Sequence, residues 1–315
     1  MKRKLLLSLA VALPLALFLA AREAASWRPQ LIGKTTASHK VQISPNGLWA
    51  CLMDGEGSEI WDLQTWQRVR GKFYGFQDFS PDSRHFAVVI SNSRGAGALL
   101  HTPQVQLFDV ASGKLVRSWR DERHFPDDWL AKGRFSPDGK RFIVVTQKTC
   151  RQFEVASGKL LSRAELGTDE EPLRQAAISP DGRHFLESGA GVKLRRVEGG
   201  DVVLGRLDAR GPMGWSPDGQ FYWDRDAKFN NLRLWRLRDH TLVQKVTYDT
   251  WLHFTPDSKH LAVATPKGLE LRDVLTGKIV QTLPGPQDDP FAFAPDGSFA
   301  VAVDGGGKIW KWRLK

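Results

Sequence analysis

Residues 135–145 read FSPDGKRFIVV, and this stretch decides the fold. Pro137 presets the first corner of a tight turn, Asp138 forms local hydrogen bonds, and Gly139 closes the turn. Residues 141–145 are aromatic and β-branched, and they have the length of a strand. The stretch therefore predicts two antiparallel strands joined by a turn.

The same turn occurs seven times along the chain. The copies are SPNG at 44–47, SPDS at 80–83, SPDG at 136–139, 179–182 and 216–219, TPDS at 255–258 and APDG at 294–297. Their first residues lie 36, 56, 43, 37, 39 and 39 positions apart. A period of this size indicates a repeat architecture in which each copy is one supersecondary unit.

A second element follows each turn at a regular offset. It consists of a strand, a turn that often ends in Ser/Thr-Gly-Lys, and another strand, as in QLFDVASGKLV at 106–116. One position of this element is usually aromatic. It holds Trp61, Phe108, Phe153, Trp235 and Trp310 in five repeats, and Arg195 and Arg272 in the other two. Four strands per unit predict an all-β, seven-bladed β-propeller whose blades pack through these structural aromatic residues.

The repeats resemble the WD-repeat family. The SPDG turns and pairs such as Trp61-Asp62 and Phe108-Asp109 carry the likeness, which covers residues 28–315. The Gly-His pair that usually precedes the first strand of a repeat is missing. The family's Asp-His-Ser-Trp hydrogen-bond network is therefore not carried over. The repeats are similar to the degenerate type of bacterial exported propellers, and the resemblance implies a protein-binding scaffold or recognition module rather than an enzyme.

The last repeat stops at its third strand, KIWKWRL at 308–314. Residues 29–35, PQLIGKT, precede the first repeat and have no other role in the pattern. We expect them to supply the missing outer strand of the last blade, which closes the ring and removes an exposed sheet edge.

Residues 1–26 differ from the rest of the chain. Three basic residues at 2–4 precede an apolar run at 5–21 that contains no charged residue, which is typical of an export signal or a membrane anchor. The sequence thus predicts a propeller domain at 27–315 outside the cytoplasm, either tethered to the membrane or released by cleavage.

The net charge is +10, of which residues 1–25 carry +3. The basic body is either an ordinary surface or one that favours an acidic partner, such as a phospholipid surface or cell-wall polymer. Cys51 and Cys150 lie in different repeats, and we expect two buried, unpaired thiols.

No catalytic, metal or cofactor motif is found in the sequence. His85, His184 and His260 share one repeat position, at which other repeats hold Trp, Arg or Phe, so we interpret them as strand-start residues rather than ligands. Residues 224–230 match a calcium loop too poorly and are expected to form an exposed loop. Some aromatic residues stand next to basic ones, as at Trp235-Arg236, but they lie within strands, where we expect them to pack between blades. We therefore do not interpret them as a nucleic-acid-binding surface. A propeller hydrolase or lactonase is the alternative. It would need inward-facing polar groups from several blades, and aligned repeats offer only turn-forming aspartates.

The connections between strands differ in length on the two faces of the predicted propeller. The SPDG and Ser-Gly-Lys turns lie on one face, and two insertions, 91–104 and 120–132, fall on the other. The second insertion is the candidate loop for binding a protein partner of a monomeric propeller. Its candidate contact residues are Arg120, Arg123, His124, Phe125, Asp127, Asp128 and Trp129. The alternative is that Phe125 and Trp129 pack the loop onto the propeller.

Overall fold

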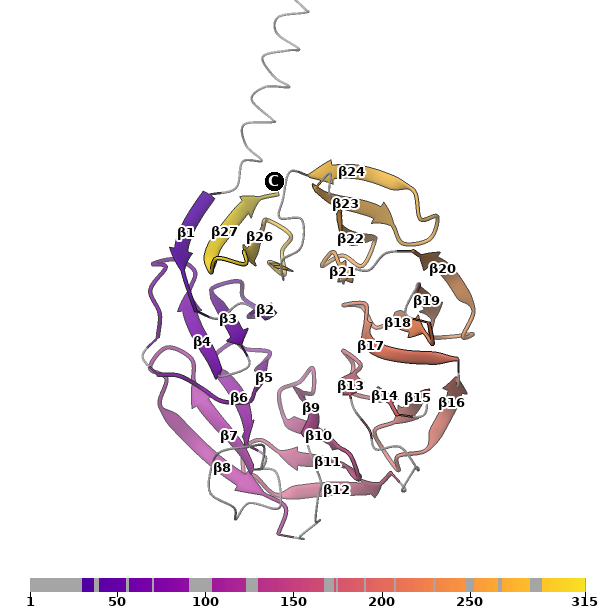
Figure 1. Cartoon of the computed structure of the whole chain (residues 1–315). Coiled ribbons are helices and arrows are strands. Elements are labelled where there is room, and N and C mark those ends of the chain that lie inside the picture. The colour runs from indigo at the N-terminus through magenta and orange to yellow at the C-terminus, as the bar shows by residue number, and fades with distance from the viewer. Residues whose placement is uncertain are drawn as a thin grey trace, which may run out of the picture.

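The ring of seven blades is visible at once in the computed structural model of the chain (Figure 1). The structure describes residues 30–36, 40–54, 57–69, 71–90, 104–122, 130–166, 173, 175–189, 191–206, 208–228, 231–247, 252–265, 268–283 and 291–314. All regular elements within these ranges are β-strands, and each blade is an antiparallel sheet. The predicted seven-bladed propeller is confirmed.

The first three blades run from the innermost strand outward in chain order. Blade one contains β2 (Lys40–Ile43), β3 (Trp49–Asp54) and β4 (Gly57–Asp62); blade two contains β5 (Phe76–Phe79), β6 (His85–Ile90), β7 (Gln104–Asp109) and β8 (Leu115–Arg120); blade three contains β9 (Leu130–Phe135), β10 (Arg141–Thr146), β11 (Thr149–Glu154) and β12 (Leu160–Glu165). Beyond β4, blade one continues through two isolated bridges, Ser58 to Phe73 and Trp61 to Arg68, in place of a fourth strand.

The other four blades repeat this order. Blade four contains β13 (Gln175–Ile178), β14 (His184–Ser188), β15 (Val192–Arg196) and β16 (Val202–Arg206); blade five contains β17 (Ala209–Trp215), β18 (Phe221–Asp226), β19 (Leu232–Arg236) and β20 (Leu242–Val246); blade six contains β21 (Leu252–Phe254), β22 (His260–Thr265), β23 (Gly268–Asp273) and β24 (Ile279–Leu283); blade seven contains β25 (Phe291–Phe293), β26 (Phe299–Val303), β27 (Lys308–Arg313) and β1 (Gln30–Lys34).

The ring closes through its two ends, as the sequence predicts. Strand β1 pairs antiparallel with β27, with Gln30 opposite Lys311 and Lys34 opposite Lys308. The backbone N–H of Thr35 extends the pairing by donating to Gly307 O at 2.8 Å. The amino-terminal strand is therefore the outer strand of blade seven.

The proline turns hold the inner two strands of each blade together. In blade three, Arg141 N donates to Ser136 Oγ at 3.0 Å, and the Ser136 hydroxyl donates to Asp138 Oδ1 at 2.6 Å. Gly139 takes a positive φ of 68°, which a glycine adopts without strain. Blades two and six carry serine at this position, and Ser83 and Ser258 accept a φ of 59° there.

Side-chain alternation along the strands builds a separate core between each pair of blades. In β10, Phe142 and Val144 pack against blade two, whereas Ile143 and Val145 pack against blade four. This is the two-residue period of a strand that is buried on both faces. The structure places the five aromatic residues of the aligned position in these cores, each against the preceding blade. They are Trp61, Phe108, Phe153, Trp235 and Trp310.

The predicted amino-terminal segment, 1–26, lies outside the described residues. Among the residues that the structure does describe, no helix has the length and apolar character needed to cross a membrane. Cys51 and Cys150 are free and buried, as expected. Burial raises the pKa of Cys150 to about 12 and also raises that of Cys51, so both thiols stay protonated at neutral pH.

Candidate functional site

The candidate binding loop joins the outer strand of blade two to the innermost strand of blade three. Arg120 is the last residue of β8 and is exposed. The other six candidate contact residues, Arg123, His124, Phe125, Asp127, Asp128 and Trp129, lie outside the described residues. The predicted insertion, 120–132, is too long at its carboxyl end because residues 130–132 already belong to β9. The first insertion joins β6 to β7, and its residues 91–103 are also outside the described part.

The base of this loop is held by a buried ion-pair cluster. Asp121 follows β8 directly and is only 5% exposed. It accepts hydrogen bonds from Arg151 Nε at 3.0 Å and from Arg163 Nη1 at 2.9 Å. Both arginines belong to blade three, and Arg151 is almost completely buried. Because a buried charge without its partner is costly, Asp121 fixes the start of the loop to the next blade.

In two further connections between blades, an arginine of the following blade also contacts the connecting segment. In blade four, Arg195 donates to Leu166 O at 3.0 Å, just after β12, and pairs with Glu187 at 2.7 Å. In blade five, Arg233 pairs with Asp208, which follows β16. Arginines of the third strand thus form crossover latches, in which a side chain of one blade fixes the connection from the preceding blade.

The contacts of Arg233 also bear on residues 224–230, which were predicted to form an exposed loop. Asp224 belongs to β18, is completely buried and accepts a hydrogen bond from Arg233 Nε at 2.7 Å. The prediction of an exposed loop is wrong at this residue, because the carboxylate is the internal counter-charge of the blade-five latch.

Hydrogen bonds that involve side chains join the innermost strands of the first three blades. Gln42 Nε2 donates to Asp78 Oδ1 at 2.8 Å, and Phe135 N donates to Asp78 Oδ2 at 3.2 Å. Gly133 N donates to Gln77 Oε1 at 2.8 Å. Both carboxylate oxygens of Asp78 therefore accept hydrogen bonds from uncharged donors of the neighbouring innermost strands.

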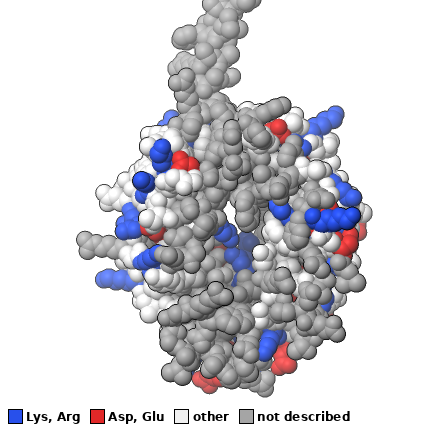
Figure 2. Space-filling model, in the orientation of Figure 1, with Lys and Arg blue, Asp and Glu red and all other residues white. Residues whose placement is uncertain are grey.

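Two lysines lie near this carboxylate, and an arginine interacts electrostatically with one of them. Lys40 begins β2 of blade one, and Lys132 and Arg134 belong to β9 of blade three. The Lys40 and Lys132 ammonium groups lie within hydrogen-bond reach of each other, and Asp78 interacts electrostatically with both. Basic atoms are visible inside the opening at the middle of the ring (Figure 2). We call Lys40, Lys132, Arg134 and Asp78 the channel cluster.

The lysines of the channel cluster have lowered pKa values. Lys40 is exposed, but the protein packed around its side chain desolvates the ammonium group and lowers its pKa. Desolvation, followed by the charge of Lys40, lowers the pKa of Lys132 to about 7. At neutral pH Lys132 is thus close to its titration midpoint.

His253 of β21 is a further titratable group that interacts electrostatically with Lys40. Desolvation, and then the charge of Lys40, lowers the pKa of His253 to about 4. Its ring centroid lies 4.3 Å from that of Phe291 in blade seven. The imidazole is therefore neutral at physiological pH and packs as an aromatic group between two blades.

Sequence reasoning missed the channel cluster. The expectation that turn-forming aspartates are the only aligned polar groups is wrong for the innermost strands. Asp78, Arg134 and His253 all lie two residues before the first residue of their turn, and Lys40 and Lys132 lie four before it. Aligning the repeats at these two positions would have revealed them, because alternate residues of a strand share one side.

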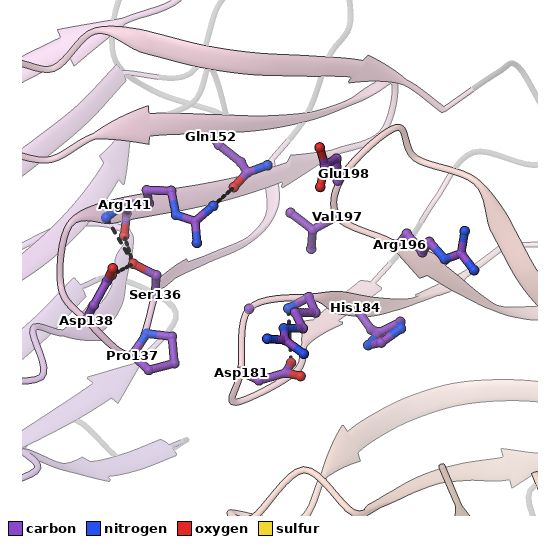
Figure 3. Close-up of a pocket in the computed structure, with 12 residues that line it drawn as sticks. Ser136, Pro137, Asp138, Arg141, Gln152, Asp181, His184, Arg196, Val197 and Glu198 are labelled. Atoms are coloured by element: carbon purple, nitrogen blue, oxygen red, sulfur yellow. Dashed lines mark hydrogen bonds between the residues drawn. The ribbon is translucent and has the colours of Figure 1, made fainter. Parts of the chain in front are cut away.

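A pocket lies between blades three and four on the face of the SPDG turns. It has a volume of about 540 Å³ and contains three arginines and three carboxylates (Figure 3). Arg141 turns toward Gln152, and Asp138 turns toward Ser136, whose hydroxyl lowers the pKa of Asp138. A smaller pocket of about 320 Å³ lies between the turns of blades six and seven. Both pockets form between neighbouring copies of the repeated turn. In the larger one the arginines and carboxylates are equal in number, and Arg141 and Asp138 form hydrogen bonds with neighbouring side chains.

The three histidines with a shared repeat position do begin strands, namely β6, β14 and β22. Burial lowers the pKa of His184. Within the described ranges, no group of three or more His, Cys, Asp or Glu side chains could hold a metal ion.

Comparison with known proteins supports the propeller fold. No family model and no curated protein matches the chain. The chain is similar in structure to the β-propeller domain of Cps50 (Swd1) from Myceliophteria thermophila, with a TM-score of 0.67, 14% identity, and coverage of 91% of this chain and 100% of that one. It is also similar to hydrazine synthase from Kuenenia stuttgartiensis, with a TM-score of 0.64, 16% identity, and coverage of 90% and 98%. At these identities the likeness shows a shared propeller fold.

Proposed function

We propose that the protein is an exported WD-repeat-type propeller that acts as a non-enzymatic scaffold or recognition module, and that it binds its protein partner through the candidate loop. The observation that carries this proposal is the anchored base of the loop. Asp121 is fixed by Arg151 and Arg163 of the next blade, and the loop ends in β9, the innermost strand of that blade.

An anchored loop suits recognition because less conformational entropy is lost when it binds. The residues between its two anchors include Arg123, Phe125 and Trp129. Arginine and large aromatic side chains dominate binding energy at protein interfaces. The opposite face, by contrast, is built from seven copies of one turn and offers little that distinguishes one blade from another.

The amino-terminal sequence supports the proposed location. The basic residues at 2–4 and the apolar run at 5–21 are those of an export signal or anchor, which would hold or release a monomeric propeller outside the cytoplasm. An alkaline phosphatase fusion after residue 26 tests this directly. Because alkaline phosphatase forms its disulfides only outside the cytoplasm, we expect the fusion to be active and the same fusion without residues 1–26 to be inactive. An inactive fusion that carries residues 1–26 would refute the proposed location.

A comparison of two triple variants tests the binding proposal. The first replaces Arg123, Phe125 and Trp129 with alanine in the candidate loop. The second replaces Lys114, Leu115 and Val116 with alanine, which are exposed at the opposite face and likewise combine one cation with two large apolar groups. Each protein is used to retrieve partners from an envelope extract after chemical crosslinking, and folding is checked by thermal melting.

We expect one stoichiometric partner to be retained by the wild type and by the turn-face variant, and to be lost by the loop variant. A partner that survives the loop change, or that only the turn-face change removes, would refute the loop as the binding surface. The absence of a stoichiometric partner from extracts of several growth conditions would count against a scaffold.

A further inference from the structure

We infer that the channel cluster is a binding site for a small ligand that carries an oxyanion group, such as a phosphate or a carboxylate. The inference concerns a site on the ring axis. It is independent of the partner loop, and either one can fail without the other.

The charges of the cluster do not balance among the described residues. Lys40, Lys132 and Arg134 carry three cationic side chains, and Asp78 is the single carboxylate that interacts with the two lysines. Arg134 Nη1 donates to Ile178 O of blade four at 3.2 Å, a neutral acceptor that leaves its charge uncompensated. An opening lined by one sign of charge with protein walls concentrates ions of the opposite sign.

The two lysines are neighbouring hydrogen-bond donors that one anion can contact at the same time. They come from blades one and three, and the side chain of Asp78 in blade two lies between them in the wall. Lys132 Nζ reaches one backbone oxygen, Gln77 O, at 3.4 Å, which is a long contact. Two ammonium groups within hydrogen-bond reach repel each other when both are protonated, so one of them must give up its proton or find an anion.

A bound oxyanion removes this conflict. Its oxygens accept from both ammonium groups, and its charge restores the ordinary preference of each lysine for the protonated form. Above pH 7, binding is therefore expected to draw a proton from the buffer onto Lys132. Lys40, Asp78, Arg134, Cys51 and His253 are the other titratable or charged groups that interact with this pair.

The test is a calorimetric titration of the full-length protein at pH 8 with sulfate, which represents a phosphate group, and with succinate, which represents a carboxylate. Chloride at equal ionic strength corrects for screening. Neither probe exchanges protons at this pH, so repeating the titration in two buffers of different ionisation enthalpy measures proton uptake by the protein itself. Lys132→Met and Lys40→Met remove one cation each. Lys140→Met, at an exposed turn of blade three, is the matched control.

We expect sulfate or succinate to bind the wild type and the Lys140→Met variant with uptake of roughly half to one proton. Lys132→Met and Lys40→Met should bind at least about ten-fold more weakly, since one charge-assisted contact is lost. Which probe binds more tightly distinguishes a phosphate ligand from a carboxylate ligand.

Two results would overturn the inference. One is that neither probe at millimolar concentration binds the wild type more than chloride does. The other is that Lys132→Met binds with unchanged affinity. Thermal melting in chloride guards against misfolding, and removing a cation from a repelling pair is expected to leave the melting temperature equal or higher.

Discussion

Replacing Asp121 with asparagine isolates the latch at the base of the candidate loop. The substitution keeps the shape of the side chain and removes its charge. Arg151, whose side chain is 2% exposed, and Arg163, at 18%, then face a neutral amide. Removing one partner of a buried ion pair costs about 3–5 kcal/mol. That is a large fraction of the roughly 5–15 kcal/mol that stabilises a folded protein.

Urea unfolding followed by tryptophan fluorescence measures this loss. Two controls separate the latch from a general charge effect. Asp239→Asn removes an exposed carboxylate that pairs with Arg236 at 3.3 Å, and it should leave the midpoint unchanged. Asp121→Asn combined with Arg151→Met removes both buried charges, and should recover part of the lost stability.

The result that refutes the reasoning is equally specific. If Asp121→Asn unfolds at the wild-type urea concentration, the buried cluster does not hold the loop. If the double variant is less stable than the single one, Arg151 stabilises the blade independently of Asp121. In either case, the anchored loop no longer supports the proposed recognition surface.

Three further predictions follow from the channel and the ring closure. Because the folded-state pKa of Lys132 is about 7, below its ordinary value, unfolding takes up a proton between pH 7 and 10; the free energy of unfolding should rise with pH there by at most about 1.4 kcal/mol per unit, and Lys132→Met should flatten that slope. His253, with a folded-state pKa of about 4, stabilises the protein above pH 6.5, and this contribution is lost as the pH falls toward 4; His253→Phe should show a smaller acid loss than the wild type, by at most about 3 kcal/mol in urea titrations. A Cβ on Gly307 would collide with the carbonyl oxygen of Thr35, so Gly307→Ala should lower the melting temperature by opening the ring closure, whereas Gly305→Ala, with open space around it, should not; equal melting temperatures for both would contradict the closure.

The blade architecture could be predicted from the sequence because its signals are local. Each Ser-Pro-Asp-Gly turn encodes its own geometry within four residues, as the bonds around Ser136 and Asp138 show. The closing strand could be predicted too, since a repeat that lacks its last strand leaves one unpaired edge and one unassigned segment.

The functional clusters depend on contacts between blades and were not predictable in this way. Asp121 and Arg151 lie 30 residues apart in neighbouring blades, so no local pattern marks them as partners. Asp224 looked like part of a loop because its partner, Arg233, is on another strand. Lys40 and Lys132 are 92 positions apart, and their meeting depends on the curvature of the ring.

The most direct test of the account is the dissociation constant of the purified partner, measured with the wild type and with the two triple variants. Loss of an arginine and two large aromatic groups at an interface centre should weaken binding at least about 100-fold in the loop variant (Arg123, Phe125 and Trp129 to alanine). The turn-face variant (Lys114, Leu115 and Val116 to alanine) should bind within about two-fold of the wild type, because its altered residues lie outside the proposed interface. Equal weakening by both variants, or weakening by the turn-face variant alone, would contradict the claim that this propeller recognises its partner through the loop between blades two and three.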